Sequence, residues 1–244
     1  MRLTRVFVDS PLTPDADVRL PDAAAVHVGR VLRLREGAVL IAFDGSGNDY
    51  RCEILSVKGD EVLVRVGPRS SGLQESPLRI TLVQAVSRGE RMDWTLQKAT
   101  ELGVRTIIPV LSARSVVRLD DSQAEKKLRH WQAIVAGACE QCGRSVVPEI
   151  RQPQELSRYL ASSTREGQRF VLSPTGPASL AGLTSVGARV ELLIGPEGGL
   201  DDAELERAAA SGYAPVRLGP RVLRTETAGI VALTVLQATW GDLV

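Results

Sequence analysis

Two glycine-punctuated loops in the last quarter of the chain constrain its fold most strongly. The first, Gly195-Pro196-Glu197-Gly198-Gly199, follows an apolar run at residues 190–194, and the second begins at Gly219 after an apolar run at residues 216–218. Short apolar runs of this kind are typical of buried strands in parallel sheets. Each loop is therefore predicted to leave the carboxyl end of such a strand.

A helix is predicted after each loop. Asp201 followed three residues later by Glu204 is a capping-box pattern, and residues 228–240 are apolar with helical character. Open α/β sheets bind ligands where strands end and helices begin. Two such loops in tandem, both with charged residues, favour a binding site. The alternative, that the glycines only serve the turns, stays open at this point.

The rest of the chain shows two different patterns of expected secondary structure. Residues 1 to about 70 predict a small β barrel or meander, with strands at residues 5–8, 39–43, 50–57 and 61–66 and a helix at 26–34. From residue 78, strands and helices alternate, which is typical of a parallel sheet covered on both faces. We predict two domains, residues 1–72 and 73–244. The further strands expected are 80–86, 106–110, 146–147 and 170–172, and the further helices are 91–102, 123–140, 154–161 and 178–183.

Composition narrows the class of protein. The 244 residues are 43% hydrophobic, enough for a substantial core, and the net charge is +1, so no strong overall attraction to nucleic acid is expected. There is no apolar run of membrane-spanning length and no leader-like pattern at the N-terminus. With only three cysteines, a reducing cytoplasmic location is expected.

Cys139 and Cys142 form a CxxC pair, but its context argues against a redox or metal-binding role. A redox pair would open a helix after a strand, whereas this one lies at the end of a predicted helix. A zinc site needs two further ligands, and the chain has only two histidines, His27 and His130. We interpret the pair as structural or incidental and expect no metal.

Charged residues collect at the predicted carboxyl edge of the sheet. Arg88 and Arg91 follow the strand at residues 80–86, and Arg224 and Glu226 lie in the second glycine loop. A carboxylate at a helix N-terminus can serve only as a cap. No P-loop and no GxGxxG motif is present, so a conventional dinucleotide site is not supported.

Several longer segments together carry a family resemblance. They are HVGRVLR at residues 27–33, FDG at 43–45, RMDW at 91–94, QKATELGV at 97–104, ACEQCGR at 138–144, and the two glycine loops with the RVLRTETA run at 221–228. With these segments the chain resembles the 16S ribosomal RNA uridine N3-methyltransferases, a branch of the SPOUT superfamily. Arg88 departs from the pattern, since lysine is expected there, but the positive charge is kept.

The resemblance implies a complete architecture and activity. The C-terminal domain would be an α/β SPOUT fold with a parallel sheet and a deep trefoil knot, with knot and cofactor site at about residues 170–230, and the N-terminal unit a PUA-like RNA-binding β-barrel. The cofactor would be S-adenosylmethionine. The substrate would be one uridine in the decoding region of 16S rRNA, methylated at N3 in the assembled small subunit. The protein would be a homodimer through its C-terminal domain.

For such a reaction, the chemistry of uracil N3 suggests roles for charged residues of the two loops. Arg224 would stabilise the deprotonated base, and Glu226 or Glu197 would take its proton. Candidate RNA contacts are Arg5, Arg30, Arg33, Arg88 and Arg91. Carried over from the family residue by residue, the resemblance implies a cofactor pocket lined by Leu172, Ile194, Gly195, Pro196, Glu197, Gly198, Leu218, Gly219, Leu223, Arg224, Thr225 and Ala228.

Two alternatives remain open on the sequence alone. The chain could be a SPOUT methyltransferase with another RNA substrate, such as a tRNA or a ribose 2′-hydroxyl. It could also be a non-catalytic RNA-binding ribosome-assembly factor that keeps the fold. The intact glycine loops argue against the second alternative.

Overall fold

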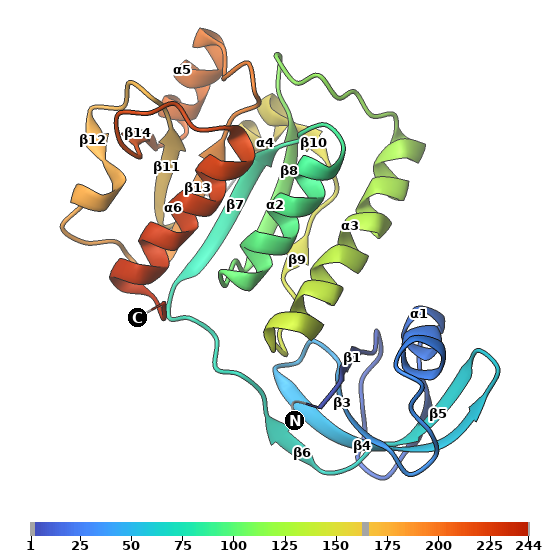
Figure 1. Ribbon diagram of the computed structural model, residues 1–244. Coiled ribbons are helices and arrows are strands. Elements are labelled where there is room, and N and C mark those ends of the chain that lie inside the picture. Colours follow the sequence, from blue (N-terminus) through green and yellow to red (C-terminus); the bar gives the residue numbers. More distant parts are fainter. Residues whose placement is uncertain (1–2, 163–165, 244) are drawn as a thin grey trace. The chain divides into compact units, whose positions relative to one another are not determined.

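The structure is a computed structural model that describes residues 3–162 and 166–243. The chain forms two compact units (Figure 1). The first consists of Met1–Glu75 with Ala136–Val147, and the second of Ser76–Val135 with Pro148–Val244. The predicted division into residues 1–72 and 73–244 remains a prediction. The compact first unit includes a second segment, Ala136–Val147, that lies far along the chain from residue 72.

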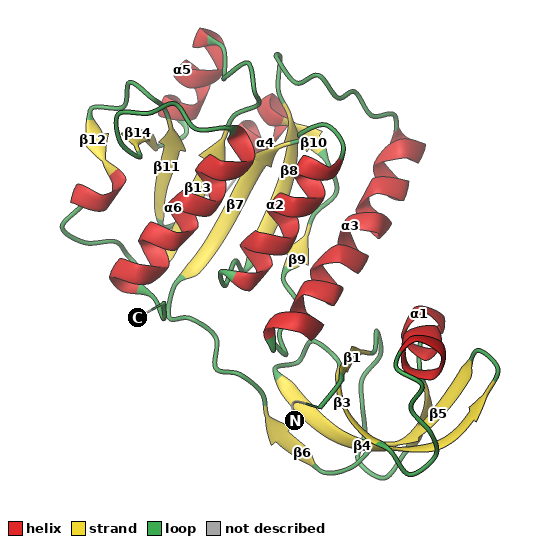
Figure 2. Ribbon diagram, in the orientation of Figure 1, coloured by secondary structure: helices red, strands yellow, loops and turns green. Residues whose placement is uncertain are grey.

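A mainly antiparallel sheet builds the first unit (Figure 2). Its strand order is β1-β3-β4-β5-β2, with β6 paired to β4, and only β1 and β3 run parallel. The strands are β1 (Arg5–Phe7), β2 (Asp17–Arg19), β3 (Val39–Phe43), β4 (Asn48–Lys58), β5 (Glu61–Arg65) and β6 (Arg69–Ser71). The strand-rich character predicted for this part of the chain is confirmed.

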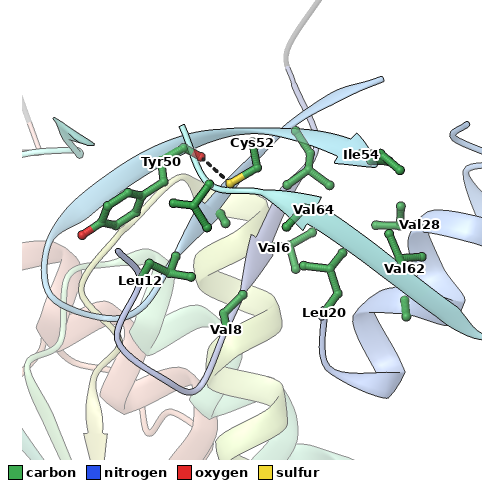
Figure 3. Packing of buried hydrophobic residues seen from close by; sticks show 14 residues of the cluster. Val6, Val8, Leu12, Leu20, Val28, Tyr50, Cys52, Ile54, Val62 and Val64 are labelled. Atoms are coloured by element: carbon green, nitrogen blue, oxygen red, sulfur yellow. Dashed lines mark hydrogen bonds between the residues drawn. The ribbon is translucent and has the colours of Figure 1, made fainter. Parts of the chain in front are cut away.

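Alternation along the strands forms the core of this unit (Figure 3). Tyr50, Cys52 and Ile54 of β4 are buried and face Val62 and Val64 of β5, as the two-residue period of a strand requires. The cluster closes with residues from loops and from the short helical segment. Apolar burial on this one face stabilises the sheet.

The helical segment of this unit differs from the prediction. We expected one helix at residues 26–34, whereas α1 spans Asp22–Val26 and continues as a π-helical turn, His27–Val31. Pro21, which precedes α1, suits a helix start because proline lacks an amide donor that would go unused there. Arg33 ends the segment in the left-handed region, at φ 54°.

A buried polar network ties residues 136–147 into the first unit. The Arg5 guanidinium pairs with Asp49 at 2.6 Å and donates to Ser145 Oγ at 2.8 Å. The Phe7 amide donates to Glu140 Oε1 at 2.9 Å. Both Glu140 and Ser145 belong to the second segment, so these contacts explain why the last turns of a long helix group with the sheet.

The second unit is a parallel sheet of eight strands. Its order is β10-β8-β7-β13-β11-β14-β12, with β9 paired to β8. β13 lies between β7 and β11, so the strand order reverses at this point. The strands are β7 (Arg79–Ala85), β8 (Thr106–Leu111), β9 (Glu149–Ile150), β10 (Gln154–Glu155), β11 (Gln168–Leu172), β12 (Ala178–Ser179), β13 (Arg189–Ile194) and β14 (Tyr213–Arg217).

Helices cover both faces of this sheet (Figure 1). α2 (Glu90–Glu101) and α6 (Thr225–Trp240) lie side by side on one face, where Leu82 of β7 is buried. α4 (Leu156–Ser162) and α5 (Asp202–Ala210) pack on the other, against Val83 and Leu193. The long helix α3 spans Asp121–Cys142. The predicted parallel α/β architecture is thus confirmed.

Two predicted elements are wrong in type or place, and a third is shifted. Residues 146–147 form no strand, and the short β9 begins at Glu149. The helix predicted at residues 178–183 is instead the two-residue strand β12 followed by a 3-10 turn, Leu180–Gly182. The helix predicted at residues 154–161 is confirmed as α4, which begins two residues later, after the two-residue strand β10. Strands this short carry no periodic signal, so pairing with a neighbouring strand decides them.

Candidate functional site

The carboxyl ends of β11, β13 and β14 enclose a cavity of about 680 Å³. Its walls come from the two glycine loops and the start of α6. Every residue of the predicted cofactor set lines it: Leu172, Ile194, Gly195, Pro196, Glu197, Gly198, Leu218, Gly219, Leu223, Arg224, Thr225 and Ala228. The structure therefore brings together, in one cavity, residues separated by more than fifty positions in the chain.

One hydroxyl group joins the two loops. Thr225 Oγ1 donates to the Gly195 carbonyl at 2.6 Å and accepts from Gln84 Nε2 at 3.1 Å. Gln84 is fully buried at the carboxyl end of β7. One turn along α6, a Cβ at Gly229 would lie 3.2 Å from Gln84 Oε1, so a glycine here lets the helix approach the strand closely.

The first loop is held from outside by residues that the sequence did not single out. Arg114 Nη1 donates to the Gly198 carbonyl at 3.1 Å. The capping box is confirmed, since Asp201 accepts from the Glu204 amide, and Glu204 Oε1 accepts in addition from the Ala113 amide at 2.8 Å. The loop after β8 thus fixes the start of α5. No local signal marks this partnership, because the residues are about ninety positions apart.

The second loop depends on a single backbone conformation. Gly219 has φ 133°, a region that residues with a side chain rarely adopt. It directs the chain from β14 into the loop, where Val222 is 79% exposed. α6 begins at Thr225 with Arg224 in the N-cap position, and Arg224 makes no side-chain cap.

Three charged groups converge on the cavity. Arg91 Nη1 lies 3.1 Å from Glu197 Oε1, and its Nε lies 4.0 Å from Glu226 Oε1. The Glu226 side chain is only 13% exposed, against 31% for Glu197. Glu226 Oε2 is buried and has no hydrogen-bond partner among the described residues. A buried carboxylate oxygen without a donor is costly, so a donor supplied by a ligand would satisfy it.

The predicted RNA contacts are scattered. Arg91 lies at the cavity, and Arg88 is exposed just before α2. Arg30 and Arg33 are exposed in the first unit, where Arg30 pairs with Asp60. Arg5 differs from the others, because its side chain is 9% exposed and held by Asp49 and Ser145. We therefore assign Arg5 a structural part in the first unit and omit it from the RNA contacts proposed below.

The CxxC pair carries no visible chemistry. Cys139 and Cys142 are free thiols, and burial raises the pKa of Cys139 to about 12, so the thiol stays protonated at neutral pH. Within the described ranges, no three histidine, cysteine, aspartate or glutamate side chains gather as a metal site would require. None of the described helices has the length and apolar character needed to cross a membrane.

Comparison with known proteins agrees with the fold. Residues 74–237 match the model of an RNA methyltransferase domain, and residues 20–67 match that of an RNA methyltransferase PUA domain. The ribosomal RNA small subunit methyltransferase E of Buchnera aphidicola (Schizaphis graminum strain) is 34% identical over 99% of this chain and 98% of its own length. The chain belongs to the ribosomal RNA small subunit methyltransferase E family. The Bacillus subtilis member is 32% identical over 86% of this chain and 85% of its own length.

Solved structures of this methyltransferase family match along the whole chain. The Neisseria gonorrhoeae enzyme, crystallised with bound S-adenosylmethionine, is 35% identical with a TM-score of 0.91. A Legionella pneumophila protein described as a methyltransferase, also solved with S-adenosylmethionine, is 40% identical with a TM-score of 0.95. Both comparisons cover 100% of each chain. The predicted family is thus confirmed.

Proposed function

We propose that this chain methylates N3 of one uridine in the decoding region of 16S rRNA, with S-adenosylmethionine as methyl donor and the assembled small subunit as substrate. Membership of a small-subunit rRNA methyltransferase family supports the substrate class. The observation that carries the chemistry is Glu226 Oε2, which is buried and has no hydrogen-bond partner among the described residues, in a cavity that Arg224 also lines. This pair supplies an acceptor for a proton and a cation for the charge left behind.

The cavity fits S-adenosylmethionine in chemistry and size. Its volume of about 680 Å³ lies within the usual range of small-molecule sites. Main-chain groups at Gly195, Gly198 and Gly219 are accessible to a neutral adenine ring, and Leu172, Ile194 and Leu218 offer it apolar contacts. When bound, the cofactor supplies a methyl group already activated on a sulfonium centre, so no metal is required.

The chain's own residues would prepare the uridine. Uracil N3 carries a proton at neutral pH and is not nucleophilic until that proton leaves. Glu226 Oε2 takes the proton, since it is a buried acceptor at the cavity wall. The negative charge then spreads onto the uracil O2 and O4, and the Arg224 guanidinium faces and stabilises it. Glu197, which is more exposed and paired with Arg91, holds the loop.

The resemblance also suggests the assembly. The C-terminal unit would carry a deep trefoil knot around residues 170–230 and would form a homodimer. Half-buried apolar residues on α6, among them Ile230, Val231 and Val235, supply apolar surface for such an interface. A dimeric mass in light scattering at micromolar concentration is expected, and a monomeric mass would contradict the dimer. As an enzyme acting on ribosomal subunits, the protein would work in the cytoplasm.

RNA contacts are assigned to exposed arginines. Arg30 and Arg33 belong to the PUA-like unit, and Arg88 precedes α2. Specific RNA recognition usually needs an unstacked nucleotide, so these cations would hold the flanking backbone. Replacing Arg30 and Arg33 together by glutamate should weaken RNA binding and leave cofactor binding intact. Loss of both activities would instead indicate misfolding.

The decisive experiment is methyl transfer from labelled S-adenosylmethionine to small subunits and to naked 16S rRNA from cells that lack the modification. Label on N3 of a single uridine, and only with subunits, is expected. Ribose-methylated nucleoside or a labelled tRNA would replace this substrate with another. Failure to bind the cofactor at millimolar concentration would overturn the catalytic assignment in favour of a non-catalytic RNA-binding factor.

A further inference from the structure

A second cavity, of about 500 Å³, lies at the amino ends of the same parallel sheet. Arg79 and Thr81 of β7, Arg189 of β13 and Arg169 of β11 line it. In the strands, these positions share a face with the apolar core under α4 and α5, which includes Val83. The cavity is therefore where that core ends and polar side chains replace it, at the end of the sheet opposite the candidate active site.

Arginines dominate its lining. Five of them, Arg79, Arg105, Arg151, Arg169 and Arg189, face two glutamates, Glu166 and Glu191. The strand register makes this arrangement costly. Arg79 and Arg189 are direct partners in neighbouring parallel strands, and Arg105, just before β8, lines the same cavity. Like charges on adjacent strands repel each other, so an anion between them would relieve the repulsion.

The carboxylates already have partners. Glu191 lies 3.6 Å from the Arg169 guanidinium and accepts from the hydroxyls of Tyr159, at 2.8 Å, and Tyr213. Burial, and then the charge of Glu191, raises the pKa of both tyrosines, which keeps them protonated as donors. Glu191 is thus held in place by three groups.

The remaining arginines divide into paired and unpaired ones. Arg189 pairs with Glu166, and Arg151 pairs with Glu149 at 3.0 Å. Arg79 and Arg105 are exposed, and neither forms an ion pair with a residue in the described ranges. Thr81 and Thr106 add hydroxyl groups beside these two cations. The lining of the cavity therefore keeps a positive charge that no carboxylate neutralises at Arg79 and Arg105.

We propose that this cavity is a binding site for a phosphate-bearing ligand, with the phosphate between Arg79, Arg105 and Arg189. Guanidinium groups bind phosphate oxygens through paired, charge-assisted hydrogen bonds. A volume of about 500 Å³ accommodates a mononucleotide. The phosphate comes either from an RNA backbone or from a free phosphorylated metabolite, and the two sources share this chemistry.

The test uses the full chain saturated with S-adenosylmethionine, so that the carboxyl-edge cavity is filled. Calorimetry then measures the binding of adenosine 5′-monophosphate and, separately, of a short oligouridylate. The double variant Arg79→Gln/Arg105→Gln should bind the phosphate probe at least about tenfold more weakly, because two charge-assisted contacts are lost. The matched control is Arg129→Gln, since Arg129 is an exposed arginine of α3 whose ion pair, with Glu125, lies outside this cavity. It should bind as the wild type does.

Each outcome decides. If the double variant loses affinity for the monophosphate but not for the oligouridylate, the ligand is a small metabolite. If it loses affinity for both probes in parallel, the ligand is RNA. Equal affinity of the wild type and the double variant, or no binding by the wild type at millimolar probe, overturns the site. A purely structural role for Arg79 and Arg105 would lower the thermal midpoint of the double variant, whereas relief of repulsion should leave it unchanged or raise it. Failure of methyl transfer would count against the function proposed for the carboxyl-edge cavity and would leave this phosphate site untouched.

Discussion

The two ends of the parallel sheet in the second unit use different parts of the chain to form their cavities. At the carboxyl edge the walls are loops, and Gly195, Gly198 and Gly219 expose main chain. At the amino edge the walls are the first residues of strands, and the lining consists of side chains such as Arg79 and Arg189. One edge thus suits a ligand that contacts main chain, and the other suits an anion.

The difference follows from where backbone hydrogen bonds are already used. Inside a strand, each amide and carbonyl is committed to the ladder, so only side chains remain for a ligand. In a glycine loop after a strand, the main chain lies outside the ladder, and the missing side chain lets a ligand approach it closely. A single sheet can therefore hold two chemically distinct sites without competition for the same atoms.

The largest expected effect belongs to the carboxyl edge. Glu226→Gln keeps the shape of the side chain but removes the proton acceptor, so turnover should fall by about 10²- to 10⁴-fold while cofactor affinity stays nearly unchanged. Turnover and S-adenosylmethionine affinity would be measured on the same preparation. Glu197→Gln is the matched control, since Glu197 lines the same cavity and pairs with Arg91. A larger loss in the control would exchange the two roles.

Arg224→Ala should lose at least about a hundredfold in turnover, because the charge on the uracil oxygens would lack its cation. Cofactor binding, measured by calorimetry, should remain normal. Arg221→Ala provides the comparison, since Arg221 lines the same cavity and is also exposed. Unchanged turnover in Arg224→Ala would exclude the proposed role and leave the carboxyl edge a binding site whose chemistry lies elsewhere.

These two edges also differ in how far the sequence could predict them. The carboxyl-edge cavity was predictable because its walls are two continuous runs, residues 195–199 and 218–228, each with its own strand and helix signals. Sequence reasoning also placed Arg91 near this edge. It missed Arg114, in the loop after β8, and Gln84, in β7, which contact these loops and show no local pattern.

The amino-edge cavity was not predictable. Arg79, Arg105, Arg169 and Arg189 lie as far as 110 positions apart, and only the strand register brings them together. Each appears in the sequence as a single cation at the start of a strand. The short strands β9, β10 and β12 were missed for a related reason, since a two-residue strand is decided by its partner.

A smaller effect tests whether the two glycine loops form one unit. Thr225→Val keeps the shape of the side chain but removes the hydrogen bonds to Gly195 and from Gln84, which leaves buried polar atoms unsatisfied. The free energy of unfolding should fall by about 1–3 kcal/mol, and cofactor affinity should fall with it. Urea denaturation and calorimetry measure the two effects. Thr234→Val in the same helix is the control, because its hydroxyl donates to the Ile230 carbonyl of the same helix and links no loops. Equal losses in both variants would mean that the link between the loops contributes no more to stability or cofactor affinity than an ordinary hydroxyl within the helix.

The smallest effect tests the amino edge and is visible only at high pH. In the folded protein the pKa of Tyr213 is raised above its usual value of 10.0, first by burial and then by Glu191. The unfolded chain therefore releases this proton from about pH 10, while the folded chain retains it, so stability is complete below pH 10 and falls as pH rises above it. Each such tyrosine contributes a slope of about 1.4 kcal/mol per pH unit. Tyr213→Phe should therefore lose stability less steeply than the wild type between pH 10 and 11, measured by urea denaturation. Parallel curves would mean that the pKa of Tyr213 is not raised in the folded protein, which would contradict its burial beside Glu191.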